Sequence, residues 1–222
     1  MTLRISIFWV LLCLLPGSLA MAEPRLEETM RCVACHRFSP GTSIDQQKAP
    51  DLFYAGNKFQ KKWLEDFLQN PTQIRKAGFV TTPGFLSGKS DPVAHVSLNE
   101  QDAQKMSAHL LSLKLPSLDT KQVDEQPLSK GQRVRTKILF ERDYGCIACH
   151  EGLNLAGQAR GGVSGPSLAN AGNRLQADWV FNRLKTPEKF ALKSRMPKFP
   201  LEEDALVRLS KYILSLKLEP TE

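Results

Sequence analysis

Two short motifs of the same pattern are the residues of this chain most suited to chemistry. Residues 32–36 (CVACH) and 146–150 (CIACH) each place two thiols three positions apart, with a histidine directly after them. Two thiols at this spacing can bond to the two vinyl groups on neighbouring pyrrole rings of a haem, and the next imidazole then faces the iron. The pattern predicts two covalently bound c-type haems, attached through Cys32, Cys35, Cys146 and Cys149.

Two other uses of such cysteine pairs stay open at this point. A Cys₄ zinc site could take one pair from each motif, and a C-x-x-C pair can be a redox-active dithiol. The zinc site would leave both histidines without a role, and the dithiol needs no histidine. The chain has five cysteines, and all except Cys13 belong to the two motifs. Haem attachment uses every cysteine and histidine of both motifs, so it is the preferred interpretation.

The first 22 residues have the pattern of a secretory signal peptide. Arg4 gives a basic start, residues 5–15 are apolar, and residues 20–22 (AMA) offer a cleavage site. The apolar run is too short to span a bilayer comfortably. We therefore expect export to the periplasm with cleavage after Ala22, and cleavage after Ala20 fits nearly as well. The alternative is an uncleaved N-terminus that anchors the chain to the outer face of the inner membrane.

The chain carries an excess of positive charge. Its 30 basic and 23 acidic residues give a formal net charge of +7, and loss of Arg4 with the leader would lower this to +6. Such an excess suits an acidic protein partner or an anionic surface. The charges form no dense tract, and nothing else in the sequence indicates nucleic acid as a partner.

The sequence contains two copies of one unit. Residues 57–71 match residues 173–187 at a spacing of 116 (173 − 57), and residues 98–114 match residues 201–217 at a spacing of 103 (201 − 98). The first copy therefore carries 13 extra residues (116 − 103) between the two matches, and duplication with one insertion explains the pattern. We expect an N-terminal domain over 23–115, a polar linker over 116–127 and a C-terminal domain over 128–222.

Apolar residues recur at helical spacing in both copies, and no segment alternates as a strand would. The short helices are expected to end at the prolines that follow them, and Ser97 with Glu100 fits a capping box. We therefore predict an all-α fold in which β-structure is scarce. The predicted helices cover residues 61–69, 98–114, 129–143, 178–185 and 201–217.

With these motifs and elements, each copy resembles a class I c-type cytochrome domain, and the pair is similar to the tandem di-haem cytochromes c of bacterial periplasms. The resemblance extends over nearly all of residues 25–218. It implies an all-α fold of two tandem domains, each wrapped around one covalent haem. It also implies that His36 and His150 are the proximal iron ligands, and that the carbonyls of Pro50 and Pro166 accept hydrogen bonds from these imidazoles.

The family places a methionine before its last helix as the distal iron ligand. Met196 holds this place in the second copy and is predicted to bind haem 2. In the first copy the aligned residue is Val93, which cannot bind iron, and His95 is our choice for haem 1. Met106 and His109 are alternatives that fit core packing better, and an open or water-bound iron is the remaining option.

The expected function is single-electron transfer between redox partners, as a free carrier or as a subunit of a membrane respiratory complex, without catalysis by the chain itself. Methionine raises a haem potential relative to a second histidine, so electrons should enter at haem 1 and leave from haem 2. The rival class is a di-haem enzyme, peroxidase-like or oxidising sulfur compounds, with an open or labile distal site at haem 1.

A group of basic residues around Met196 would form a rim that steers an acidic redox partner toward the second haem. In the sequence only Glu188 opposes this group. Its members are Arg183, Lys185, Lys189, Lys193, Arg195 and Lys198.

Overall fold

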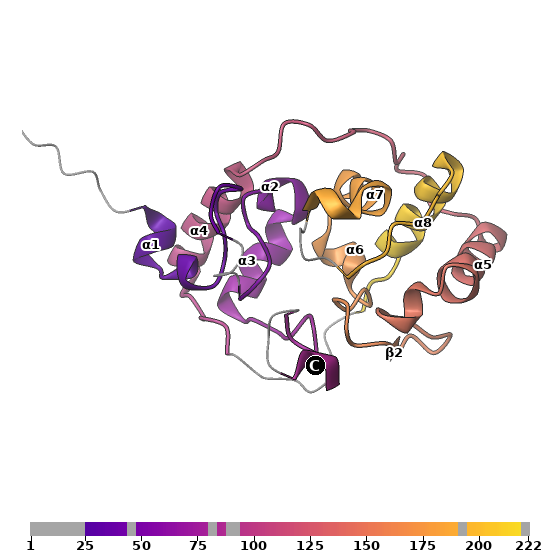
Figure 1. The fold of residues 1–222 in the computed structure, drawn as a ribbon, viewed down its shortest axis with the longest axis horizontal. Helices are drawn as coiled ribbons and strands as arrows, with labels where there is room; N and C mark the ends of the chain where they lie inside the picture. The colour runs from indigo at the N-terminus through magenta and orange to yellow at the C-terminus, as the bar shows by residue number, and fades with distance from the viewer. Residues whose placement is uncertain (1–24, 44–47, 80–83, 88–93, 191–194, 219–222) are drawn as a thin grey trace, which may run out of the picture.

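The computed structural model describes residues 25–43, 48–79, 84–87, 94–190 and 195–218. The signal peptide predicted over residues 1–22 lies outside this part of the chain, as do Val93 and Lys193. The N-terminal and C-terminal halves lie at opposite ends of an elongated molecule and meet through their central helices (Figure 1). Within the described residues, no helix is long and apolar enough to cross a bilayer.

The N-terminal half is built around two packed helices, α3 and α4. Leu64 and Leu68 are buried on α3, and Ala103, Met106 and Leu110 are buried on α4 at helical spacing. Its elements are α1 (Leu26–Thr29), the 3₁₀ turn η1 (Cys32–Ala34), α2 (Ala55–Lys58), α3 (Lys61–Gln69), the 3₁₀ turn η3 (Phe85–Ser87) and α4 (Glu100–Ser112).

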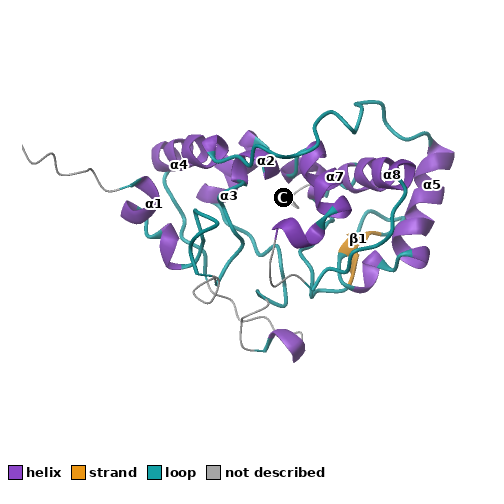
Figure 2. Cartoon of the chain, turned by 45° about the horizontal axis from the view of Figure 1, so that its top comes forward, coloured by secondary structure: helices purple, strands orange, loops and turns teal. Residues whose placement is uncertain are grey.

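The C-terminal half repeats α2, α3 and α4 as α6, α7 and α8, and adds a longer first helix and a β-hairpin (Figure 2). The added helix α5 continues into a π-helical turn, η4, directly before the second motif. The elements are α5 (Lys130–Ile138), η4 (Leu139–Asp143), η5 (Cys146–Ala148), β1 (Glu151–Leu153), β2 (Ala159–Gly161), α6 (Ala171–Arg174), α7 (Ala177–Lys185), η6 (Pro187–Phe190) and α8 (Glu203–Leu214).

The hairpin after the second motif was not expected from the sequence. Strands β1 and β2 are antiparallel, and Glu151 pairs with Gly161 while Leu153 pairs with Ala159. Each strand has only three residues, which is too short for a period of two to stand out from the surrounding loop. The described residues are therefore mainly helix and loop, with one small antiparallel sheet.

The predicted capping box at the start of α4 was wrong. The N-cap is Asn99, whose side chain accepts a hydrogen bond from the amide of Asp102 at 2.9 Å. Ser97 instead donates its hydroxyl to the carbonyl of Gln69 at the end of α3. Ser97 therefore links the segment before α4 to the end of α3, and Asn99, an equally favourable N-cap residue, caps the helix.

The backbones of the two halves meet through equivalent residues. Phe59 and Leu175, which occupy the same position in the two copies, form an isolated antiparallel bridge. The amide of Gln60 donates to the carbonyl of Arg174 at 2.9 Å, and the amide of Gln176 donates to the carbonyl of Lys58 at 3.0 Å. The contact is thus a local two-fold arrangement in which each half offers the same segment to the other.

The side chains of the two glutamines repeat this symmetry. Nε2 of Gln60 donates to the carbonyls of Gly172 and Leu175 at 3.0 and 2.7 Å. Nε2 of Gln176 donates to the corresponding carbonyls of the first half at 3.1 and 2.6 Å. We call this pair, Gln60 and Gln176, the glutamine clasp. Each side-chain amide donates to two carbonyls in or directly after a short helix of the opposite half. The two halves are therefore in direct hydrogen-bonded contact and are not connected by the linker alone.

Candidate functional site

The two C-x-x-C-H motifs have the same local structure. In η1, the amides of Cys35 and His36 both donate to the carbonyl of Cys32, at 3.2 and 3.0 Å. The corresponding bonds in η5 have the same two lengths. The residue before each turn is left-handed, Arg31 with φ 60° and Gly145 with φ 59°. Glycine adopts this conformation readily, whereas arginine does so only where its surroundings hold it there.

The four cysteines of the motifs are free thiols. Burial raises the pKa of Cys146 to about 11 and also raises that of Cys32. A dithiol that exchanges electrons, or a thiolate that binds zinc, is favoured by a lowered thiol pKa. Within the described residues, no three histidine, cysteine or acidic side chains gather as a protein metal site requires.

Both motif histidines are fixed through the same nitrogen. Nδ1 of His36 bonds to the carbonyl of Pro50 at 2.6 Å, and Nδ1 of His150 bonds to the carbonyl of Pro166 at 2.8 Å. A carbonyl can only accept, so Nδ1 carries the proton and Nε2 keeps its lone pair. Burial lowers the pKa of each imidazole to about 4, which leaves both rings neutral at pH 7. A neutral ring with a free Nε2 is the form that binds a metal.

A buried ion pair supports the first of these histidines. Arg37 follows His36 and donates twice to Asp51, which follows Pro50, at 2.7 Å in both bonds. Arg37 is 5% exposed and Asp51 is 2% exposed. The pair links the two segments whose neighbours form the His36–Pro50 bond, so it helps to hold the ring. The ion pair was not predicted from the sequence, although the charged residues directly after the histidine and the proline were a usable signal.

The second site is supported by charge from the opposite half. Glu151, directly after His150, is buried and pairs with Lys76 of the first half at 2.6 Å. The amide of Ser167, directly after Pro166, donates to the carbonyl of Ile74 at 2.7 Å. The segment that follows α3 therefore holds the loop of the second histidine, a role that the sequence did not reveal.

His95 lies opposite His36. The two ring centres are 6.1 Å apart, with 64° between the ring planes. Nδ1 of His95 donates to the carbonyl of Val96 at 2.8 Å, so Nε2 is again the nitrogen left for a metal. A metal held at about 2 Å by two imidazole nitrogens separates the ring centres by roughly 6 Å. The spacing of His36 and His95 fits one iron between them.

The two alternatives for the first distal ligand have other contacts. Met106 is completely buried in the core on α4. His109 stacks on Phe38, with 6.2 Å between ring centres, and its Nε2 lies 2.9 Å from a carboxylate oxygen of the buried Glu27. Both positions agree with core packing between α4 and the segment that carries the first motif. His95 thus remains the candidate that faces the proximal ring.

Met196 is half-buried and packs against the apolar core. Nearby, the rings of Tyr144 and Phe199 make an edge contact at 5.5 Å, which joins the loop of Met196 to the helix that precedes the second motif. The loop therefore lies against the elements that carry His150. Its role as the distal ligand of haem 2 stays a prediction.

Unneutralised cations gather where the halves meet. Burial lowers the pKa of Lys58 to about 7 and that of Arg75 and Arg174 to about 10, and repulsion from neighbouring arginines adds to the shift at Lys58 and Arg75. No ion pair of the described residues includes these three side chains. Arg174 is buried, and Lys58 and Arg75 are half-buried. Cations enclosed in this way are costly unless an anion accompanies them, and a haem brings two carboxylates. Lys58 and Arg174 occupy the same position in the two copies, a signal that the sequence analysis missed.

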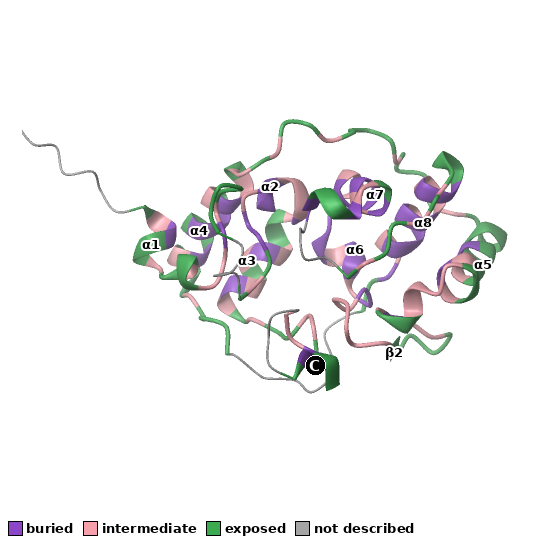
Figure 3. Ribbon diagram, viewed as in Figure 1, coloured by how far each residue is buried: buried purple, intermediate pink, exposed green. Residues whose placement is uncertain are grey.

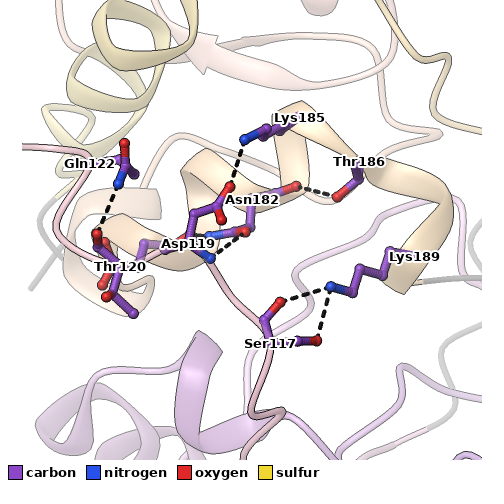
Figure 4. Close-up of polar contacts among 9 residues, drawn as sticks. Ser117, Asp119, Thr120, Gln122, Asn182, Lys185, Thr186 and Lys189 are labelled. Atoms are coloured by element: carbon purple, nitrogen blue, oxygen red, sulfur yellow. Dashed lines mark hydrogen bonds and ion pairs between the residues drawn. The ribbon is translucent and has the colours of Figure 1, made fainter. Parts of the chain in front are cut away.

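The expectation that only Glu188 opposes the basic group around Met196 was wrong. Figure 4 shows Ser117 and Asp119 of the linker beside α7 and the turn after it, where Asp119 pairs with Lys185 at 2.6 Å. The backbone carbonyl of Asp119 also accepts from the buried Asn182 at 2.7 Å, and its amide donates to the same side chain at 3.1 Å. Lys189 donates to Ser117 at 2.8 Å.

Further along the same loop, Lys198 pairs with Glu188 at 2.9 Å. Among the described members of the group, four are thus engaged within the chain itself: Arg183, which donates to the carbonyl of Pro187, and Lys185, Lys189 and Lys198. Sequence spacing could not show this, because the linker that supplies Asp119 and Ser117 lies more than 60 positions away and meets α7 only in the folded chain.

Comparison of the chain with protein-family models, with curated proteins and with solved structures found no match. The functional assignment therefore rests on the residues and contacts described above.

Proposed function

We propose that this chain is a periplasmic di-haem c-type cytochrome that transfers single electrons between redox partners, without catalysis by the chain itself. The observation that carries the proposal is the repeated C-x-x-C-H motif, whose histidine is held through Nδ1 by a proline carbonyl in both halves, at 2.6 and 2.8 Å. On this proposal, each half is a class I cytochrome c domain that surrounds one haem. The haems would be attached through Cys32, Cys35, Cys146 and Cys149.

A bound haem would supply an iron that alternates between the ferrous and ferric states as one electron arrives or leaves. The chain contributes two neutral imidazoles, His36 and His150, whose basicity is increased by the hydrogen bonds from Nδ1 to the proline carbonyls. His95 and Met196 are the proposed distal ligands. Lys58 and Arg174 have no acidic partner among the described residues, and the carboxylates of a haem would neutralise them.

Unequal distal ligands would give the two sites different potentials. A second histidine stabilises ferric iron more than a methionine does, so the site of His36 and His95 should have the lower potential. Electrons would then enter at the N-terminal half and leave from the C-terminal half. The clasped interface supports transfer inside the molecule, since it keeps the two halves in contact.

One observation favours a second candidate function. The side chain of His95 is exposed, whereas that of His36 is half-buried. A distal ligand on an exposed loop can be displaced, which would open haem 1 to peroxide or a sulfur compound. Carbon monoxide separates the two candidates: rapid binding to the reduced first haem would favour the enzyme, and its absence would favour the electron carrier.

The central test is the mass of the protein after maturation in a host that attaches c-type haem. We expect the polypeptide mass plus two haems, with cleavage of the leader after Ala22 or Ala20. Redox titration of the wild type, His95→Ala and Met196→Ala should then give two separate potentials, each variant shifting one of them. The bare polypeptide mass would end the proposal, and two indistinguishable potentials in the wild type would remove the assignment of unequal ligands.

A further inference from the structure

A cationic surface with an apolar centre lies beside the second motif. A groove of about 610 Å³ runs between α5 and the hairpin turn, lined on the helix by Val134 and Ile138 and on the turn by Leu155 and Ala156. Val134 is 56% exposed and Ile138 is 41% exposed. Leu155 is 98% exposed at the tip of the hairpin. Large apolar side chains in one exposed group indicate a contact surface, because scattered single residues would not form such a group.

The acidic residue inside the groove is already neutralised. Glu141 pairs with Lys137 at 2.5 Å and with Arg160 at 3.0 Å. These two pairs leave the groove with one more cation than anion. The floor of the groove is therefore apolar, and its internal charge is weakly positive.

The rim of the groove carries cations with no acidic partner. Lys130 lies one helical turn before Val134 on the same face of α5, and Arg133 and Arg135 flank this face on either side. All three are exposed. Figure 3 shows that much of α5 is made of exposed residues. Within the described residues, no ion pair includes them, whereas Lys185 and Lys198 near Met196 are paired. Three exposed cations without an acidic partner thus lie together on α5, whereas two of the cations near Met196 are neutralised within the chain.

This surface belongs to the elements that enclose the second motif. Helix α5 leads through η4 into η5, and β1 begins at the residue after His150. The first half has no counterpart, because α1 has four residues, two of them acidic, and the hairpin is present only in the second half of the described chain. An apolar centre with a charged rim is the anatomy of a small protein–protein interface.

We propose that the groove between α5 and the hairpin, with its cationic rim, is the docking surface for an acidic electron-accepting protein. The inference rests on the proposed function, since it assigns a partner to the site from which electrons leave. The partner's apolar contact enters the groove around Val134 and Leu155, and its carboxylates face Lys130, Arg133 and Arg135. One electron leaves the reduced second site, and the oxidised partner gains it.

The test uses the full mature chain with both haems and, as a probe, a purified acidic cupredoxin in its copper(II) form. Binding is measured by calorimetry at low and physiological salt, and the reduction of copper(II) to copper(I) is followed in a stopped-flow experiment. We expect Arg133→Glu/Arg135→Glu and Val134→Ser/Leu155→Ser each to weaken binding by about tenfold or more, since about 1.4 kcal/mol corresponds to tenfold. Wild-type binding should weaken as salt increases.

Two matched charge reversals locate the contact. Lys62→Glu, on the exposed face of α3 in the first half, should leave binding within about twofold of the wild type, as expected for an exposed charge outside the interface. The same is expected of Arg195→Glu, beside Met196. A larger loss in Arg195→Glu than in the α5 variant would move the docking surface to the Met196 loop and overturn the proposal.

Two further outcomes would also reject the proposed surface. One is wild-type binding that is absent or independent of salt. The other is binding to vesicles of phosphatidylglycerol and phosphatidylcholine without binding to the copper protein, which would identify α5 as a membrane-contact surface. Mass measurement beforehand separates these results from failure of the proposed function, because only chains shown to carry two haems enter the test.

Discussion

The glutamine clasp allows a quantitative test of how the two halves are joined. Gln60→Leu removes the amide that donates to two carbonyls of the second half, and Gln176→Leu removes its counterpart. A net contribution of about 1 kcal/mol per hydrogen bond gives a cost of about 2 kcal/mol for either variant. The double variant should cost between about 2 and 4 kcal/mol, because loss of one amide loosens the contact in which the other acts.

Urea unfolding, followed by far-ultraviolet circular dichroism and by tryptophan fluorescence, measures this cost. The wild type should unfold in one transition by both probes, and the double variant should show two transitions as the halves become independent. Gln69→Leu is the matched control, because its amide bonds only within its own helix, to the carbonyl of Glu65 at 3.2 Å. If the clasp variants cost no more than this control, the glutamines do not join the halves and the reasoning is refuted.

Three further predictions test other parts of the structure. Arg37→Met, which leaves a buried carboxylate without its guanidinium, should destabilise the protein by about 3–5 kcal/mol in denaturant unfolding, whereas Lys62→Met in an exposed pair should cost less than about 1 kcal/mol. Gly172→Ala should lower the melting temperature, because the new methyl group would overlap a backbone carbonyl of α8. Gly131→Ala, on the open face of α5, should raise the melting temperature slightly through its higher helix propensity. Equal effects of the two variants would contradict this packing. In the haem-free chain, the pKa of Lys58 is about 7 in the folded form and about 10.4 in the unfolded form. The unfolded chain therefore binds more protons between these two values, and the free energy of unfolding should rise with pH from 7 to 10. Lys58→Met should abolish this rise, and an unchanged slope would exclude Lys58 as its origin.

Local patterns in the sequence predicted several helices well. A helix over residues 61–69, ended by the proline that follows, was predicted, and α3 covers Lys61–Gln69. The prediction for residues 178–185 differs from α7 (Ala177–Lys185) by one residue. The two longest helices are shorter than predicted. The helix predicted over 98–114 is α4 (Glu100–Ser112), and the helix predicted over 201–217 is α8 (Glu203–Leu214). Helix interiors follow apolar periodicity, whereas their ends depend on which nearby polar group satisfies the first free amides.

The sequence by itself determined the chemistry that each half can offer. Two thiols, an adjacent histidine and a proline about 14 residues on lie within one short loop, so the bond between His36 and Pro50 needs only local folding. Duplication then places the same chemistry around His150. These features depend on short separations along the chain, and composition and spacing are enough to identify them.

Only the tertiary structure decided how the two halves act together. Three features join residues more than 60 positions apart in the sequence. They are the clasp between Gln60 and Gln176, the proximity of the cations Lys58 and Arg174, and the ion pair of Asp119 with Lys185. Whether a charge is buried, paired or available depends on the neighbours that folding brings to it. A sequence pattern gives the type and order of those charges, but the energies of burial and pairing are set by distances that exist only in the folded chain.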